Sequence, residues 1–173
     1  ISATIAKRLA RFNGLDALAL YHPPRLAERF RPGPASSYVL SVGRLETVKR
    51  VDLAIKAMAH LPSSLSLIVA GTGTHQTALE QLAASLGLGP RVTFLGEVTD
   101  EQVVDLYAGA LAVVFPPYDE DYGYVTLEAF LSHKPVVTTL DAGGPNEFVT
   151  NGVNGVVTEP DPRAIAEAVA TLD

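Results

Sequence analysis

The segment YVLSVGRLETVKRVDLAIKAMAHLPSSLSLIVA, residues 38–70, contains two apolar runs with a helical pattern between them. The runs YVLSV (38–42) and SLIVA (66–70) are apolar at odd and even positions alike, as in strands that are buried on both faces. Between them one apolar stripe recurs at helical spacing, formed by Val51, Ala54, Ile55 and Met58. The segment therefore predicts two parallel strands joined by a crossover helix.

Four further apolar runs continue this alternation along the chain: VTFLG (92–96), LAVVF (111–115), PVVTT (135–139) and GVVT (155–158). Successive runs are separated by roughly 20 to 25 residues, which leaves room for a crossover helix. Local signals mark helix boundaries: Thr99 with Gln102 as a capping box, Asp161-Pro162 as a helix start, and Gly87 and Gly109 as helix ends. The pattern predicts an α/β fold, a Rossmann-like doubly wound parallel sheet of about six strands.

The composition excludes several classes of function. With 173 residues, of which 47% are hydrophobic, the chain can bury a core and is not a disordered tail. It has no cysteine, which excludes disulfides and agrees with a cytoplasmic location. The net charge is -6, and residues 37–173 hold seven Lys or Arg against seventeen Asp or Glu. Such an acidic body argues against nucleic acid as a partner.

Residues 1–36 differ from the rest in pattern and charge, with six basic residues against two acids. Ile5, Leu9 and Phe12 form a helical stripe that ends at Asn13-Gly14, and the prolines of YHPP and RPGP then stiffen a connector. We interpret residues 1–36 as the tail of a preceding domain plus a connector, and residues 37–173 as the ligand-binding domain. The exposed stripe predicts self-association. The basic residues would dock on the preceding domain or contact an anionic membrane surface, at its inner face.

Cations follow the first predicted strand. Lys49 and Arg50 fall in the expected first turn of a helix, where the helix dipole disfavours positive charge unless an anion lies nearby. Arg44 precedes them and offers a fork of donors. Arg44 and Lys49 therefore indicate a clamp for a diphosphate. The alternative is a pair of solvated cations offset by Glu46 and Asp52.

Two carboxylates follow the fourth predicted strand. Glu120 and Glu128 enclose DYGYVTL, residues 121–127, so that one lies in a loop and the other about two turns into a helix. The first amides of that helix, at Gly123, Tyr124 and Val125, would be free to bind phosphate oxygens. Glu128 would accept hydrogen bonds from a ribose, and Glu120 would stabilise positive charge at an anomeric carbon. The alternatives are a helix-surface glutamate and an acid in a wet loop.

Two other patterns are weaker. Asp119, Glu120 and Asp121 spell D-x-D, a pattern that can hold a divalent cation, but a site with two cations facing the diphosphate has less need of a metal. We therefore expect no metal cofactor. In GTGTHQ, residues 71–76, Gly71 and Gly73 would let the backbone approach a nucleotide, although the third glycine of the dinucleotide fingerprint is absent. GGPNE, residues 143–147, predicts a turn into a short helix at the rim of the site.

Taken together, these motifs resemble the carboxyl-terminal, donor-binding half of the retaining GT-B glycosyltransferases of group 1, or family 4. The resemblance covers almost the whole chain and rests on YHPP, LSVGRLETVKRVDLAIKAM, LIVAGTGTHQTALEQLA, RVTFLGEVTDEQVVDLYAGA, VVFPPYDEDYGYVTLEAF and KPVVTTLDAGGPNEFVTNGVNG. Tyr122 stands where the family usually has phenylalanine, a change that we expect to be mild.

The resemblance implies a role for each group of site residues. Glu120 would lie near the donor sugar and Glu128 on the ribose of a nucleoside diphosphate sugar. Arg44 and Lys49, after Gly43, would contact the diphosphate, and the backbone at Phe94, Leu95 and Gly96 would meet the base. It also implies an amino-terminal GT-B domain that carries the acceptor, so that the isolated chain would not transfer sugar.

YHPP and EDYGYVTLEAF further resemble mannosyltransferases of surface polysaccharide biosynthesis, with GDP-mannose as donor. Two rival interpretations remain open. One is a sugar-nucleotide epimerase or a phosphorylase half on a related architecture. The other is a flavodoxin-like module that binds a nucleotide without catalysis. The four residues Arg44, Lys49, Glu120 and Glu128 separate these readings, because only a sugar-nucleotide site needs all of them in one crevice.

Overall fold

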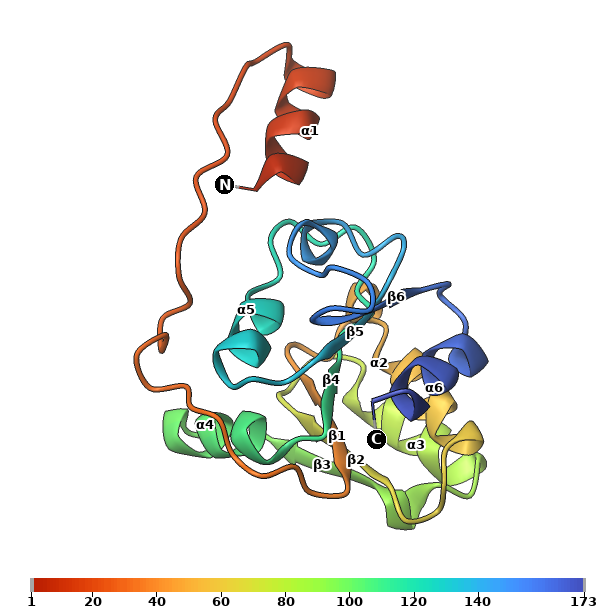
Figure 1. Ribbon diagram of the computed structural model, residues 1–173. Coiled ribbons are helices and arrows are strands. Elements are labelled where there is room, and N and C mark those ends of the chain that lie inside the picture. Colours follow the sequence, from red (N-terminus) through yellow and green to blue (C-terminus); the bar gives the residue numbers. More distant parts are fainter. Residues whose placement is uncertain (1, 173) are drawn as a thin grey trace.

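The computed structural model describes residues 2–172 and contains one sheet of parallel strands (Figure 1). The strands are β1 Tyr38–Val42, β2 Ser66–Ala70, β3 Val92–Gly96, β4 Ala112–Val114, β5 Val136–Thr139 and β6 Gly155–Thr158. Their order in the sheet is β3-β2-β1-β4-β5-β6, and every recorded pairing is parallel. The predicted doubly wound sheet of about six strands is confirmed.

Helices cover both faces of the sheet. The helices are α1 Ala3–Asn13, which lies apart from the sheet, and α2 Val51–Ala57, α3 Gln76–Ser85, α4 Asp100–Gly109, α5 Tyr124–Leu131 and α6 Pro162–Ala170, which cover it. The 3-10 turns are η1 Thr47–Lys49, η2 Met58–His60, η3 Gly89–Arg91 and η4 Gly144–Glu147. Two core clusters, one containing residues of α2, α3 and α6 and the other residues of α4 and α5, lie on opposite faces of the sheet (Figure 1). Neighbouring strand residues such as Val39 and Leu40 point into different clusters, which explains why the strands are apolar throughout.

The predicted helix boundaries are largely confirmed. Thr99 and Gln102 form the capping box of α4, and the carboxylate of Asp161 accepts from the first amides of α6. Gly87 follows α3 in a left-handed conformation, with φ of 69°. Gly109 is different, because it is the last helical residue of α4 and is not left-handed. A Cβ at Gly109 would lie 2.6 Å from the Tyr38 hydroxyl, so the glycine lets the Tyr38 side chain pack closely against the end of the helix.

The segment before β1 runs along the edge of the domain, with α1 at its far end (Figure 1). Helix α1 ends at Gly14, whose φ is 64°, as the Asn13-Gly14 pair predicted. The first amides of α1 are satisfied from the domain, because the carboxylate of Glu147 accepts from the amides of Ala3 at 2.9 Å and Thr4 at 2.6 Å.

Charge matching holds this segment on the domain. Four of its arginines pair with acids of the body: Arg8 with Asp119 and Asp121, Arg25 with Asp100, Arg29 with Asp100 and Glu101, and Arg31 with Asp105. The excess of basic residues before residue 37 is therefore partly neutralised within this chain. On α1, Ile5 and Leu9 are half-buried while Phe12 is 71% exposed. The division at residue 36, docking on a preceding domain and self-association stay predictions.

Between Ser2 and Leu172, the structure contains no helix with both the length and the apolar character that crossing a bilayer requires.

Candidate functional site

The crevice of the sheet lies between β1 and β4. The chain turns to one side after β1, toward β2 and β3, and to the other side after β4, toward β5 and β6. In open α/β sheets the loops diverge at such a point and leave a crevice at the carboxyl ends of the strands. The loops at residues 43–50 and 115–123 border this crevice, and they carry most of the residues that the sequence singles out.

The loop after β1 differs from the prediction in one respect. Lys49 lies in the 3-10 turn η1, and Arg50 is the N-cap of α2 in a left-handed conformation, with φ of 49°. Neither residue is therefore in the first turn of the helix, because the backbone at Arg50 separates η1 from α2. Arg44 is exposed and has no ion-pair partner within the described part of the chain.

Arg50 was not among the predicted site residues, but it connects the loops that follow β1, β4 and β5. Its guanidinium donates to the carbonyl oxygens of Pro116 and Pro117 at 2.8 Å and to both carboxylate oxygens of Asp141 at 2.6 and 2.8 Å. This bond from Arg50 holds the pKa of Asp141 below its usual range. The left-handed backbone at the N-cap of α2 thus lets the Arg50 side chain reach the loop after β4. No local pattern indicated the pair, because its members lie 91 positions apart.

Lys49 and Glu120 are in direct contact. The ammonium of Lys49 donates to the carboxylate of Glu120, and the two side chains are 15% and 22% exposed. The backbone of Glu120 is fixed on both sides: its amide donates to the Ala142 carbonyl at 2.8 Å, and its carbonyl accepts from the Gly144 amide at 2.7 Å. A cation and a carboxylate from two different strand ends therefore meet, as the sequence predicted.

The amino terminus of α5 lies beside this pair. Gly123 caps the helix with φ of 83°, and within residues 2–172 the structure records no acceptor for the amides of Gly123, Tyr124 and Val125. A Cβ at Gly123 would lie 3.4 Å from the ring of Phe115, and the same ring centroid is 6.0 Å from the Lys49 ammonium. Free amide donors and a lysine thus surround one aromatic ring, which suits an anion.

Glu128 is half-buried in α5 and points at α4. Its Oε2 accepts from the Tyr107 hydroxyl at 2.7 Å. Burial raises the pKa of Glu128, while the Tyr107 bond and the charge of Arg25 lower it in part. The structure records no contact between Glu128 or Arg44 and the Lys49–Glu120 pair among the described residues. It therefore brings two of the four predicted side chains into contact and leaves the other two separate.

The glycines after β2 have a structural reason of their own. A Cβ at Gly71 would lie 2.0 Å from the Gly43 carbonyl oxygen, and one at Gly73 would lie 2.4 Å from that of Leu45. The close approach that the sequence predicted for a nucleotide is thus made here by the loop after β1. Gly71 also donates to Gly96 at 2.8 Å, which places the end of β3 beside the same loop. Phe94 is half-buried and Leu95 is 43% exposed.

Acids of the D-x-D pattern have a basic partner. Arg8 of α1 donates to the side chain of Asp121 and to the carbonyl and carboxylate oxygens of Asp119, at 2.8 and 2.5 Å. In the portion of the chain that the structure describes, no group of three potential ligands could hold a metal ion. Metal independence stays a prediction.

Tyr122 uses the hydroxyl that phenylalanine would lack. This hydroxyl accepts from the His22 amide at 2.8 Å and donates to the His22 carbonyl at 2.7 Å. Tyr122 therefore links the connector to the loop that carries Glu120.

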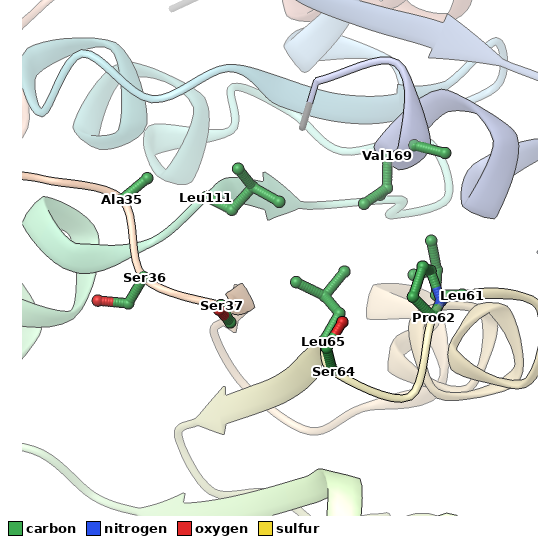
Figure 2. A pocket seen from close by; sticks show the side chains of 10 residues that line it. Ala35, Ser36, Ser37, Leu61, Pro62, Ser64, Leu65, Leu111 and Val169 are labelled. Atoms are coloured by element: carbon green, nitrogen blue, oxygen red, sulfur yellow. The ribbon is translucent and has the colours of Figure 1, made fainter.

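A cavity of about 340 Å³ lies at the opposite edge of the sheet (Figure 2). Its lining includes Ser37, Leu65 and Leu111, each of which directly precedes a strand. It is thus at the amino ends of the strands and is separate from the crevice.

The fold and the site define a doubly wound α/β domain with a lysine, a glutamate and the amino terminus of a helix at its switch point. The chain belongs to the family described as glycosyl transferases group 1, which matches residues 26–172. The predicted membership of the group 1 glycosyltransferases is confirmed.

Relatives of known sequence and structure agree with this membership. The human α-1,3/1,6-mannosyltransferase ALG2 is 33% identical over 147 residues, covering 76% of this chain and 35% of that protein. The D-inositol 3-phosphate glycosyltransferase of Nocardia farcinica is 32% identical over 196 residues, covering 99% of this chain and 43% of that protein. The chain thus spans between about a third and a half of these relatives.

Solved structures show the same architecture. HepE of Anabaena in complex with UDP-glucose has a TM-score of 0.85 at 26% identity, covering 98% of this chain and 52% of that one. The sucrose-phosphate synthase of Thermosynechococcus elongatus has a TM-score of 0.87 at 27% identity, covering 99% of this chain and 47% of that one. The sheet is therefore one Rossmann-like half of a GT-B fold.

Proposed function

We propose that this chain is the donor-binding domain of a retaining, metal-independent glycosyltransferase that transfers a sugar from a nucleoside diphosphate sugar to a glycan or lipid-linked acceptor. The observation that carries the proposal is the Lys49–Glu120 pair beside the free amides of α5. An anionic ligand and a group that develops positive charge both find a partner at this point. Neither a plain nucleotide-binding module nor a surface ion pair needs that combination.

The residues divide the chemistry between them. The amides of Gly123, Tyr124 and Val125 bind phosphate oxygens, and Lys49 and Arg44 neutralise the diphosphate as its bond to the anomeric carbon breaks. Glu120 stabilises the oxocarbenium-like charge that develops on the sugar. These interactions are stronger in the transition state than in the bound donor, and this difference accelerates the reaction.

The identities of the donor and the acceptor and the cellular location are proposed from the relatives and the sequence motifs. HepE was solved with UDP-glucose, and ALG2 is a mannosyltransferase. The motifs favour GDP-mannose as the donor, and the UDP and ADP sugars are the alternatives. The acceptor binds to the part of the enzyme outside this domain. We place the enzyme in the cytoplasm, peripheral to the inner face of the membrane, in polysaccharide biosynthesis.

Calorimetry with UDP, GDP and ADP in the presence of a chelator tests the proposal. One diphosphate binds with micromolar affinity without added metal, and Lys49→Met weakens that binding by about tenfold, because it removes one charge-assisted hydrogen bond. Lys56→Met is the matched control, since Lys56 pairs with Asp52 on the surface of α2. Absence of binding by all three diphosphates in the full-length protein would refute the proposal.

A further inference from the structure

Tyr107 is a fully buried tyrosine whose hydroxyl has one recorded partner, the carboxylate of Glu128. The ring lies in the core between α4 and the connector, where Phe30 packs against it edge-on at a centroid distance of 5.3 Å. Burial raises the pKa of Tyr107 far above its usual range, so the hydroxyl stays protonated. In the recorded bond the hydroxyl donates to the carboxylate.

The contact between Tyr107 and Glu128 joins the two helices α4 and α5. Helices α4 and α5 each begin where a strand ends, after β3 and β4 respectively. Long side chains on a helix lean toward its amino terminus, so Tyr107 and Glu128 lean toward the carboxyl edge of the sheet. The Oε2 atom of Glu128 is taken by Tyr107, whereas Oε1 has no recorded partner within residues 2–172 and is not buried. One carboxylate oxygen is thus held and the other is available to a ligand.

We propose that Tyr107 is a positioning residue that fixes the Glu128 carboxylate for the ribose hydroxyls of the donor. The inference rests on the proposed function and deepens it. Without the hydroxyl, Glu128 would lose the bond that fixes its rotamer and offsets part of the cost of its burial. Tyr107 then acts on the ligand through Glu128 alone, and its effect must depend on the hydroxyls that Glu128 contacts.

A thermodynamic cycle between protein and ligand hydroxyls tests this dependence in the full-length protein. Affinities are measured by calorimetry for the best-binding diphosphate among UDP, GDP and ADP and for its 2′,3′-dideoxy analogue. Tyr107→Phe weakens binding of the ribonucleotide by about 5- to 20-fold, because a hydrogen bond to a charged group is lost. It changes binding of the dideoxy analogue less than about twofold.

Tyr38→Phe is the matched control. The Tyr38 hydroxyl also packs against α4, donating to the Leu106 carbonyl at 2.7 Å, but it does not contact Glu128. This variant binds both ligands as the wild type does. Equal loss for both ligands in Tyr107→Phe, or no loss for either, would overturn the inference. Failure of the wild type to bind any diphosphate would instead refute the proposed function.

A second variant keeps the test decisive if Tyr107→Phe does not fold. In the Glu128→Gln background the buried group is neutral, so removal of the Tyr107 hydroxyl costs less stability. Adding Tyr107→Phe to Glu128→Gln changes ribonucleotide affinity less than about twofold, because the carboxylate through which Tyr107 acts is already gone. A further loss comparable to that of the single variant would overturn the inference.

Discussion

Glu120→Gln is expected to strengthen the binding of a nucleoside diphosphate while it slows sugar transfer by the full-length enzyme. In the free protein the Glu120 carboxylate occupies the Lys49 ammonium, and a diphosphate has to compete for the same cation. Glutamine is of equal size, and its neutral amide oxygen binds Lys49 more weakly than a carboxylate does. It also removes a negative charge beside the phosphates. Because Glu120 no longer competes for Lys49, the affinity for the diphosphate increases.

The structure sets the magnitude. A hydrogen bond to a charged group is worth about 1.5–3 kcal/mol when it is buried. The side chains of Lys49 and Glu120 are 15% and 22% exposed, so solvent screens their interaction only partly. Allowing for this screening, the free energy of the interaction is about 1–2 kcal/mol. This corresponds to roughly 5- to 30-fold tighter binding of UDP or GDP. Transfer falls by at least about 100-fold, because the charge on the sugar is no longer stabilised.

The assay is calorimetry of the wild type and Glu120→Gln with the same diphosphate at fixed ionic strength, after melting curves have shown that both are folded. The corresponding diphosphate sugar serves as a second ligand, and its affinity rises less because the contact to the sugar is lost. Equal or weaker diphosphate binding by folded Glu120→Gln would show that Lys49 does not bind the phosphates.

Three further results are expected. Gly71→Ala lowers the free energy of unfolding by about 3 kcal/mol or more in urea titrations, because its Cβ would lie 2.0 Å from a backbone oxygen of the loop after β1. Gly89→Ala, whose Cβ would have no atom within 4 Å, changes the free energy of unfolding by less than about 1 kcal/mol. Similar values for the two variants would contradict this packing. Glu128→Gln raises the melting temperature relative to wild type at pH 7 and loses this advantage toward pH 4. The folded-state pKa of Glu128 is raised by burial, so its stabilising contribution is present below the unfolded pKa and is lost as pH rises through the folded pKa; an advantage that did not grow with pH would refute this. In the full-length enzyme, Arg8→Ala lowers kcat by about 5-fold with little change in the donor KM, because Arg8 holds Asp119 and Asp121, the residues on either side of Glu120. Lys7→Ala on the same helix leaves kcat unchanged. Equal effects of the two substitutions would rule out this role.

The strands were predictable because each one carries its own signal. Central parallel strands are covered on both faces, so runs such as YVLSV and PVVTT are apolar without alternation. The capping residues Thr99 and Asp161 act within three positions of themselves and are therefore legible from local sequence.

Pairings between distant segments were not predictable in the same way. The sequence placed Lys49 and Glu120 at one crevice, but it could not show that they would bind one another across 71 positions. Arg50 was read as part of a helix because its left-handed backbone has no sequence signal, arginine being a poor residue for it. Tyr107 looked like an ordinary core residue of α4, since only the packing of α5 supplies its partner.

The family match begins at residue 26, but the stabilising contacts of the Glu120 loop begin earlier. A domain that began at residue 26 would lack three sets of contacts: the ion pairs of Arg8 with Asp119 and Asp121, the bonds from the α1 amides to Glu147, and the bond between the His22 amide and Tyr122. Asp119, Glu120 and Asp121 would then repel one another, because Arg8 would no longer neutralise the two aspartates. Chimeras that exchange donor specificity between related enzymes should therefore keep α1 and the connector with the sheet that follows them, and place the junction ahead of Ser2.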